Sequence, residues 1–251
     1  MITRVLAAGL AAGFVAGLLV ALLQHFTTTP LILAAEVYEN QVALDARPGV
    51  VLSGMHGARL ILAHVGHDAA PGAEAGDAWA PADGLERTVY ASTVTVATAV
   101  GFAFLLLAGM LVAGDAIDRQ RALSWAAAGF VVTGLAPAFG LPPELPGMHA
   151  ADLLDRQVWW IGTAVATATG LWLLLRSRGV ALPVLGLALL LAPHVIGAPH
   201  PADAGAGRVP AELAARFASV SLSVHAVLWV LVGVLAGWFW QRNETPVVAE
   251  A

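Results

Sequence analysis

Six long apolar runs dominate this chain of 251 residues and decide what it can fold into. A membrane-spanning helix needs about 20 predominantly apolar residues, because each residue rises ~1.5 Å across a ~30 Å hydrocarbon core. No Asp, Glu, Lys or Arg lies inside any of the runs, which cover residues 5–24, 90–112, 122–139, 158–175, 180–196 and 217–240. The pattern predicts an all-α, polytopic integral membrane bundle that forms a single membrane domain over residues 1–251.

Six crossings are the expectation, and two alternatives stay open. Run 180–196 is short and contains Pro183 and Pro193, so a five-helix or re-entrant arrangement is the first alternative. The second is that run 5–24 is a signal peptide with Arg4 as its basic segment. That run is longer than the usual 7–15 apolar residues, and no clean small-x-small cleavage site follows it.

Composition excludes several functional classes. The chain is 59% hydrophobic and 12% charged, whereas soluble domains are about 45–50% apolar and about 25% charged. All twelve basic residues are Arg, so a P-loop and Schiff-base chemistry are excluded, since both need Lys. The chain has no Cys and a net charge of −5, which removes thiolate metal sites and argues against nucleic-acid binding.

Arginine density predicts the orientation. Six Arg fall in the 28 residues of segments 1–4, 113–121, 176–179 and 241–251, and six fall in the 103 residues of segments 25–89, 140–157 and 197–216. Short cytoplasmic loops carry the excess of basic residues. Both termini are therefore expected to be cytoplasmic, with 25–89 as a long outer, periplasmic loop.

Small residues recur at a spacing of four. Gly9, Gly13 and Gly17 form one such series, and Gly233 and Gly237 form another. Membrane helices approach closely on small-xxx-small faces. We expect these faces to pack helices together, and contact between copies in a homo-oligomer is a second use for them.

The histidines predict a metal site in the outer loop. All eight His fall in the outer segments or in the outer halves of the runs. In segment 55–68, His56, His64 and His67 share one face of a helix, and the last two form an i, i+3 pair. Neutral imidazole suits Co, Ni, Zn and Cu. We therefore predict that these three side chains capture a divalent transition-metal ion.

Four further residues are predicted metal ligands along an entrance or a path. His25 and Glu36 follow the first apolar run, and Glu36 has a solvated helix end as its alternative role. His194 and His225 lie at membrane depth, where polar side chains are costly and frequently functional. A structural hydrogen bond between helices is the alternative for each of these two histidines.

No complete catalytic set is present, so we do not expect an enzyme. The sequence contains neither HExxH nor GxSxG, the motifs of zinc proteases and of serine hydrolases. Asp152 and Asp155 form an i, i+3 pair that could do acid–base work, but such a pair is more often a helix N-terminus that complements the dipole.

The chain resembles the CbtA family of predicted cobalt transporter subunits over nearly its whole length. The matching segments include a proline-rich motif followed by Arg-Gln-x-Trp-Trp, and they are residues 30–32, 35–39, 79–84, 87–88, 134–147, 156–160 and 193–199. The resemblance implies a multi-pass protein of the bacterial inner membrane, linked to cobalamin synthesis. It also implies a small one-helix partner, CbtB, with its own His-rich segment.

These inferences together predict Co²⁺ uptake with capture by outer-face histidines and with no permanently bound cofactor. The bilayer and the CbtB-type subunit are the expected partners. The first alternative is a metal-binding sensor or accessory subunit. The others are a membrane haem protein ligated by a pair such as His194 and His225, a permease for a substrate other than metal, and, with least support, an intramembrane enzyme.

Overall fold

The computed structural model describes residues 1–45, 81–201 and 209–243, and within these ranges the chain forms helices and no strand. The outer segment 55–68 with His56, His64 and His67 lies outside the described residues. The helices are α1 (Ile2–Phe26), α2 (Thr28–Asp45), α3 (Leu85–Val112), α4 (Arg119–Phe130), the π-helical η1 (Val131–Leu135), α5 (Ala136–Ala138), α6 (Leu153–Arg176), α7 (Ala181–Ile196) and α8 (Ala211–Arg242).

Each of the six apolar runs lies in a helical segment, which confirms the all-α membrane class. Within the described residues, four helices are long and apolar enough to cross a bilayer, namely α1, α3, α6 and α8. The run 122–139 falls in α4, η1 and α5, which follow one another without interruption. Helix α7 is shorter, with 16 residues.

The N-terminus of α6 settles the role of Asp152. Its carboxylate accepts hydrogen bonds from the backbone N–H of Leu154 at 2.9 Å and of Asp155 at 3.4 Å. An Asp at this position satisfies amide groups that have no partner inside the helix. The helix-terminus interpretation of this acidic pair is confirmed.

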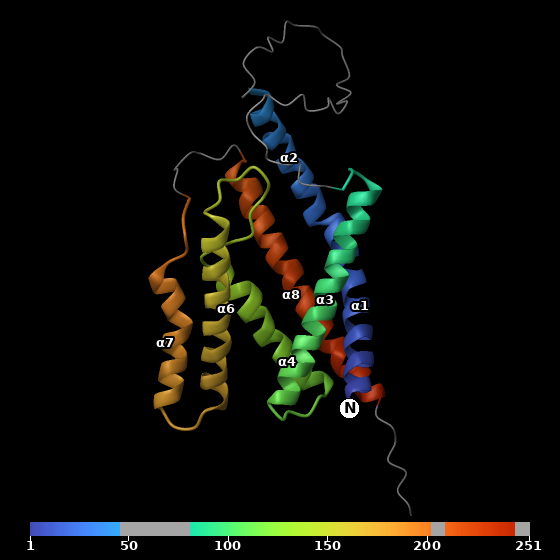
Figure 1. Cartoon of the computed structure of the whole chain (residues 1–251), viewed down its shortest axis with the longest axis vertical. Coiled ribbons are helices and arrows are strands. Elements are labelled where there is room, and N and C mark those ends of the chain that lie inside the picture. Colours follow the sequence, from blue (N-terminus) through green and yellow to red (C-terminus); the bar gives the residue numbers. More distant parts are fainter. Residues whose placement is uncertain (46–80, 202–208, 244–251) are drawn as a thin grey trace, which may run out of the picture.

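The bundle has two ends, and the N-terminus and the end of α8 share one of them (Figure 1). The start of α1, the α3–α4 connection, the α6–α7 connection and the end of α8 lie there, and we call it the terminal end. Arg4 holds α1 to α8 by donating from Nη2 to the backbone oxygen of Trp240 at 2.7 Å. The start of α1, the two short connections and the end of α8 therefore lie together, and their cytoplasmic side stays a prediction.

The glycine faces are buried inside a single chain. A Cβ at Gly13 would lie 2.3 Å from the Cα of Val100, so α1 and α3 are in backbone contact there. A Cβ at Gly237 would lie 2.6 Å from the Cα of Arg119, which joins α8 to α4 in the same way. The packing prediction is confirmed. Helices α3 and α4 occupy these faces at Gly13 and Gly237, and a homo-oligomer through them stays a prediction.

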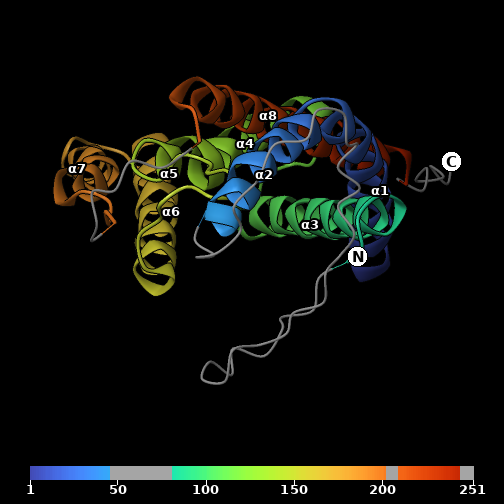
Figure 2. The ribbon, with the colours of Figure 1, turned by 90° about the horizontal axis from the view of Figure 1, so that it is seen from above.

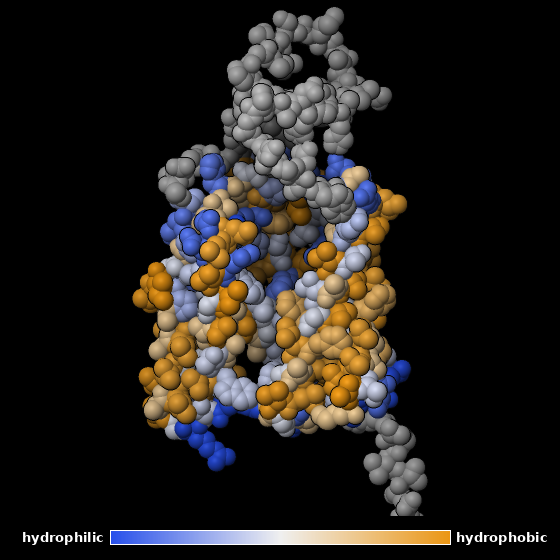
Figure 3. All heavy atoms as spheres, viewed as in Figure 1, coloured by the Kyte–Doolittle hydropathy of each residue, from blue (hydrophilic) through white to orange (hydrophobic). Residues whose placement is uncertain are grey.

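Helices α6 and α7 form a pair beside the group of α1, α3, α4 and α8 (Figure 2). Large apolar side chains remain exposed on the flanks of the helices, for example Leu18 at 48%, Leu105 at 65% and Val165 at 61%. Hydrophilic side chains gather towards the two ends (Figure 3). A surface that is apolar around its flanks suits lipid tails rather than water.

Candidate functional site

The helix of run 122–139 changes its winding in the middle. Residues 131–135 form the π-helical segment η1, and Pro137 follows it two residues later. Proline has no amide hydrogen, and its ring crowds the carbonyl of the residue four positions earlier, which here is Thr133. Widening to a π-turn relieves that crowding, and single π-turns occur frequently at functional sites.

Thr133 of η1 meets two side chains of α8, and these three residues form what we call the His225 cluster. Thr133 Oγ1 lies 3.0 Å from Nε2 of His225. Trp229 Nε1 lies 3.0 Å from the same hydroxyl oxygen and 3.2 Å from Nε2 of His225. Thr133 also donates to the backbone oxygen of Gly129 at 2.8 Å. The cluster thus ties α8 to the π segment by polar contacts.

The contacts of His225 fit either neutral tautomer. The indole N–H of Trp229 can only donate, and both Thr133 Oγ1 and Nε2 of His225 lie within its reach. Nε2 accepts in the tautomer that carries its proton on Nδ1, and it donates to Thr133 in the other. A neutral imidazole is the form that binds a metal ion.

Aromatic and small side chains hold the imidazole of His225 in place. The rings of Phe102 and Phe130 lie 5.8 and 6.0 Å from it, centroid to centroid. Gly134 lies against its open side, where a Cβ would be 2.6 Å from Cδ2. The position of the histidine therefore depends on the absence of a side chain at residue 134.

Two cavities end on opposite sides of the His225 cluster. The proline-loop cavity has a volume of about 800 Å³ and is lined by Leu141–Glu144, by α6 residues near Arg156, and by Thr133 and His225. The terminal cavity has a volume of about 630 Å³ and is lined by parts of α3, α4 and α6, and by Thr133 and Trp229. Thr133 lines both. A third, smaller crevice of about 210 Å³ between α1, α2 and α8 also reaches His225.

The proline-loop cavity has an ion pair among its lining residues. Arg156 Nη2 lies 2.8 Å from Glu144 Oε2, with the two side chains 31% and 21% exposed. Glu144 belongs to the proline-rich motif, and Arg156 lies in the first two turns of α6. The cavity therefore leads from this pair past Ser221 to the hydroxyl of Thr133 and the imidazole of His225.

The other described candidate ligands lie apart from this cluster. His25 is exposed near the end of α1, with its ring 5.1 Å from that of Phe26. His194 is exposed in the last turn of α7, with the rings of Phe139 and Trp159 at 6.0 and 6.2 Å. Neither histidine lines the two large cavities.

Glu36 is engaged in an ion pair. Its carboxylate accepts from both terminal nitrogens of Arg87, with Nη1 to Oε2 at 3.0 Å, so that α2 is joined to the start of α3. A cation would have to compete with this guanidinium for Glu36. In the described part of the chain, no group of three or more His, Asp or Glu side chains is arranged to hold a metal ion.

Sequence reasoning named His225 but missed its neighbours. Thr133 and Trp229 lie 92 and 4 positions from it along the chain. The Pro137 that follows the π segment, and the spacing of four between His225 and Trp229, were signals available in the sequence. Glu144 and Arg156 both belong to motifs that carried the family resemblance, but neither was selected as a site residue.

Comparison with protein families gives one match that covers nearly the whole chain. A family model described as "Probable cobalt transporter subunit (CbtA)" matches residues 2–241. Searches of the curated proteins and of the solved structures gave no significant match.

Proposed function

This chain belongs to the CbtA family of probable cobalt transporter subunits, and on that premise we propose that it mediates uptake of Co²⁺ through the two cavities that meet at the His225 cluster. The protein is a multi-pass membrane protein by its apolar helices and its family. We also propose the direction of transport, the transported ion, the residues that capture it and the partner.

The observation that supports the path most directly is the position of Thr133 between two cavities that extend towards opposite ends of the bundle. A metal ion with six waters needs about 200 Å³ if each water takes ~30 Å³. Both cavities exceed that volume, so a hydrated ion fits on either side of the cluster. At the cluster it would exchange water for the imidazole nitrogen of His225, a ligand that Co²⁺ accepts.

The proposed orientation of the chain rests on the arginine distribution. The terminal end carries the denser arginine and is proposed to face the cytoplasm of a bacterial inner membrane. His56, His64 and His67 would then capture the ion on the periplasmic side and raise its concentration there. His25 and Glu36, near the start of α2, would belong to the entrance, and His194 to the outer end of α7.

A partner is expected because the family is described as a subunit. We propose a CbtB-type protein with one membrane helix. The described helices carry no ATPase motif, so the energy would come from the membrane potential, an ion gradient or that partner. A metal sensor or accessory subunit is the alternative, and it would bind ions without moving them. A haem held by His194 and His225 would need both side chains to face one cavity. His225 lines the proline-loop cavity and His194 does not, so the haem alternative gains no support.

Cobalt-57 uptake in cells tests the proposal. The chain is expressed with and without a one-helix partner, beside the triple variant His56→Ala, His64→Ala, His67→Ala. The single variant His225→Ala tests the path, and His149→Ala is its control, because His149 is exposed in the segment between α5 and α6. All variants are compared at equal membrane abundance.

We expect uptake to fall in the triple variant at low cobalt concentration, and to fall in His225→Ala at every concentration. His149→Ala should retain uptake. Uptake equal to that of empty cells, with folded protein and partner present, would refute transport. Binding to the purified protein without uptake would support the sensor, and a Soret band would support the haem protein.

A further inference from the structure

Helix α6 packs against η1 and α5, and it contacts α4 only sparsely. Between α6 and α7 the backbones touch, since a Cβ at Gly170 would lie 2.7 Å from the backbone oxygen of Gly186. The Arg156–Glu144 pair joins α6 to the proline-rich motif. At the terminal end, the terminal cavity lies between α6 and the helices α3 and α4. Towards α3 and α4, helix α6 is therefore loosely packed, and its polar contacts there come from Arg176.

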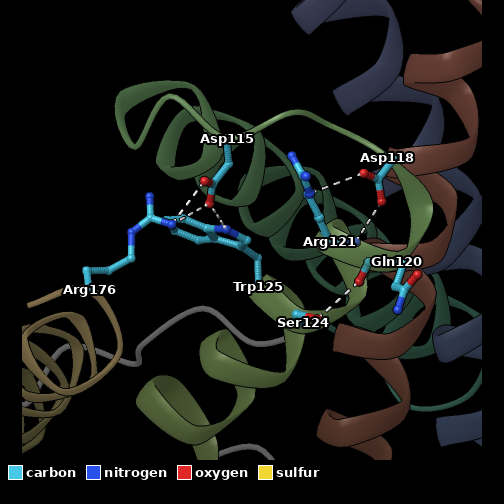
Figure 4. A network of polar contacts seen from close by, with 7 residues as sticks. All are labelled: Asp115, Asp118, Gln120, Arg121, Ser124, Trp125 and Arg176. Atoms are coloured by element: carbon cyan, nitrogen blue, oxygen red, sulfur yellow. Dashed lines mark hydrogen bonds and ion pairs between the residues drawn. The ribbon is translucent and has the colours of Figure 1, made fainter.

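Arg176, the last residue of α6, makes polar contacts beside the terminal cavity, and Figure 4 shows them. Arg176 Nη1 donates to both carboxylate oxygens of Asp115 at 3.0 and 3.1 Å, and Nη2 donates to the backbone oxygen of Ala113 at 3.1 Å. Trp125 Nε1 donates to the same carboxylate at 2.8 Å. We call Asp115, Trp125 and Arg176 the terminal lock.

The terminal lock joins α6 to α4 and to the connection that precedes α4. Asp115 lies in the α3–α4 connection, Trp125 in α4 and Arg176 at the end of α6. The guanidinium of Arg176 also lies 5.0 Å above the ring of Trp172 one turn earlier, and the rings of Trp172 and Trp125 are 6.4 Å apart. Arg176 can thus keep its cation–π contact on α6 while its contacts to Asp115 break.

The carboxylate of Asp115 loses its counter-charge when the lock opens. Asp115 is the acidic residue among those that line the terminal cavity, and Arg121 and Arg176 are the basic ones. In the closed lock Asp115 is paired with Arg176, and Arg121 lies 3.5 Å from Asp118, so each carboxylate has a guanidinium partner. Once Arg176 has moved away, a carboxylate becomes available at the cavity mouth, and a hard or borderline cation can bind to it.

We propose that the terminal lock is the exit gate of the transport path, opened by a tilt of the α6–α7 pair that separates Arg176 from Asp115. The divalent cation then replaces Arg176 at the carboxylate of Asp115 as it leaves the terminal cavity. This inference rests on the proposed function for its cargo, although the gate itself can be tested without any metal.

The absence of cysteine from the native chain makes a clean accessibility test available. A single cysteine is introduced at Ala128, which lines the terminal cavity. Its rate of reaction with a charged, membrane-impermeant methanethiosulfonate is measured from the terminal side of oriented vesicles. The backgrounds are the native lock, Asp115→Asn, and the charge exchange Asp115→Arg with Arg176→Asp. Arg178→Gln is the matched control, since it removes a guanidinium two residues from the lock.

We expect Asp115→Asn to speed labelling at least about tenfold, the rate change that corresponds to 1.4 kcal/mol of gate free energy. The charge exchange should restore slow labelling, which also shows that the variants fold. Arg178→Gln should leave labelling slow. Labelling that is unchanged in Asp115→Asn, or equally fast in Arg178→Gln, would overturn the gate.

Cobalt-57 uptake in the same vesicles separates failure of the gate from failure of the function. Lock-dependent labelling without cobalt uptake would support the gate and refute the cargo. Cobalt uptake without lock-dependent labelling would overturn the gate and leave the proposed function standing.

Discussion

Placing a methyl group at residue 134 tests whether the position of His225 matters. In Gly134→Ala, the new Cβ would lie 2.6 Å from Cδ2 of His225 and 3.2 Å from its Nε2, whereas ordinary contacts begin at 3.4 Å. The imidazole must therefore move by about 1 Å. That shift lengthens its contacts to Thr133 and Trp229, which are 3.0 and 3.2 Å in the native chain.

The magnitude follows from two terms. Overpacking a close contact costs about 1–3 kcal/mol, and polar contacts between membrane helices average about 0.6 kcal/mol each. We expect Gly134→Ala to lower the free energy of unfolding by roughly 2–4 kcal/mol. Uptake should fall about tenfold for each 1.4 kcal/mol that the displaced imidazole adds to the transport barrier.

The assay pairs cobalt-57 uptake at equal membrane abundance with thermal unfolding of the purified chain in detergent. Gly162→Ala is the matched control, because a Cβ there has nothing within 4 Å. It should unfold at the native temperature or slightly above, since Ala favours a helix over Gly by up to about 1 kcal/mol. In the double variant Gly134→Ala, His225→Ala, the clash disappears, so the two stability losses should not add.

Equal behaviour of Gly134→Ala and Gly162→Ala in both measurements would refute the argument that residue 134 positions His225. Additive stability losses in the double variant would show that the cost of Gly134→Ala arises from a different contact.

Three further outcomes are expected. Replacing Glu36 by Gln breaks its pair with Arg87, and the two side chains are 27% and 33% exposed. The free energy of unfolding in detergent should therefore fall by no more than about 1 kcal/mol. A large loss of uptake at unchanged stability would instead indicate that Glu36 is a metal ligand. Hydrogen bonds from Arg176 and Trp125 lower the pKa of Asp115 in the folded chain. The ionised carboxylate therefore stabilises the fold above the ordinary carboxyl pKa of about 3.9. That stabilisation is lost as the pH falls towards the lower pKa of the folded state. The stability difference between the native chain and Asp115→Asn should therefore shrink in unfolding scans below about pH 4, and a constant difference would contradict the pairing. Gly237→Ala should lower the free energy of unfolding by about 1–3 kcal/mol. Gly101→Ala should not lower it, because a Cβ there has nothing within 4 Å. Similar melting temperatures of the two variants would refute the close approach of α8 and α4.

Much of the fold could be read from local patterns. The end of run 90–112 matches the end of α3 at Val112, and the glycine series on α1 and α8 lie at buried helix contacts, as predicted. Such features depend on length, apolar content and spacing within one segment, which a sequence displays directly. The placement of Asp152 at the start of α6 was likewise readable, since its capping partners are two and three residues away.

The candidate site was readable only in part. Histidine at membrane depth marked His225 as a polar residue that needs a role, and the structure places it on the proline-loop cavity beside Thr133, which lines both large cavities. Its role as a ligand stays a prediction, as do those of His25, Glu36, His194 and the three histidines of segment 55–68. No sequence pattern paired Glu36 with Arg87, because their side chains come from different helices.

The sequence by itself determined that this chain is a membrane helix bundle and which segments are apolar enough to lie at membrane depth. These follow from the hydrophobic effect acting on each segment separately. The tertiary structure decided which side chains meet across helices: Thr133 with His225, separated by 92 positions, and Asp115 with Arg176, separated by 61. Those meetings depend on the rotation and tilt of each helix, which are set by close packing at glycines and by the π-turn before Pro137, and one segment's pattern does not contain that information.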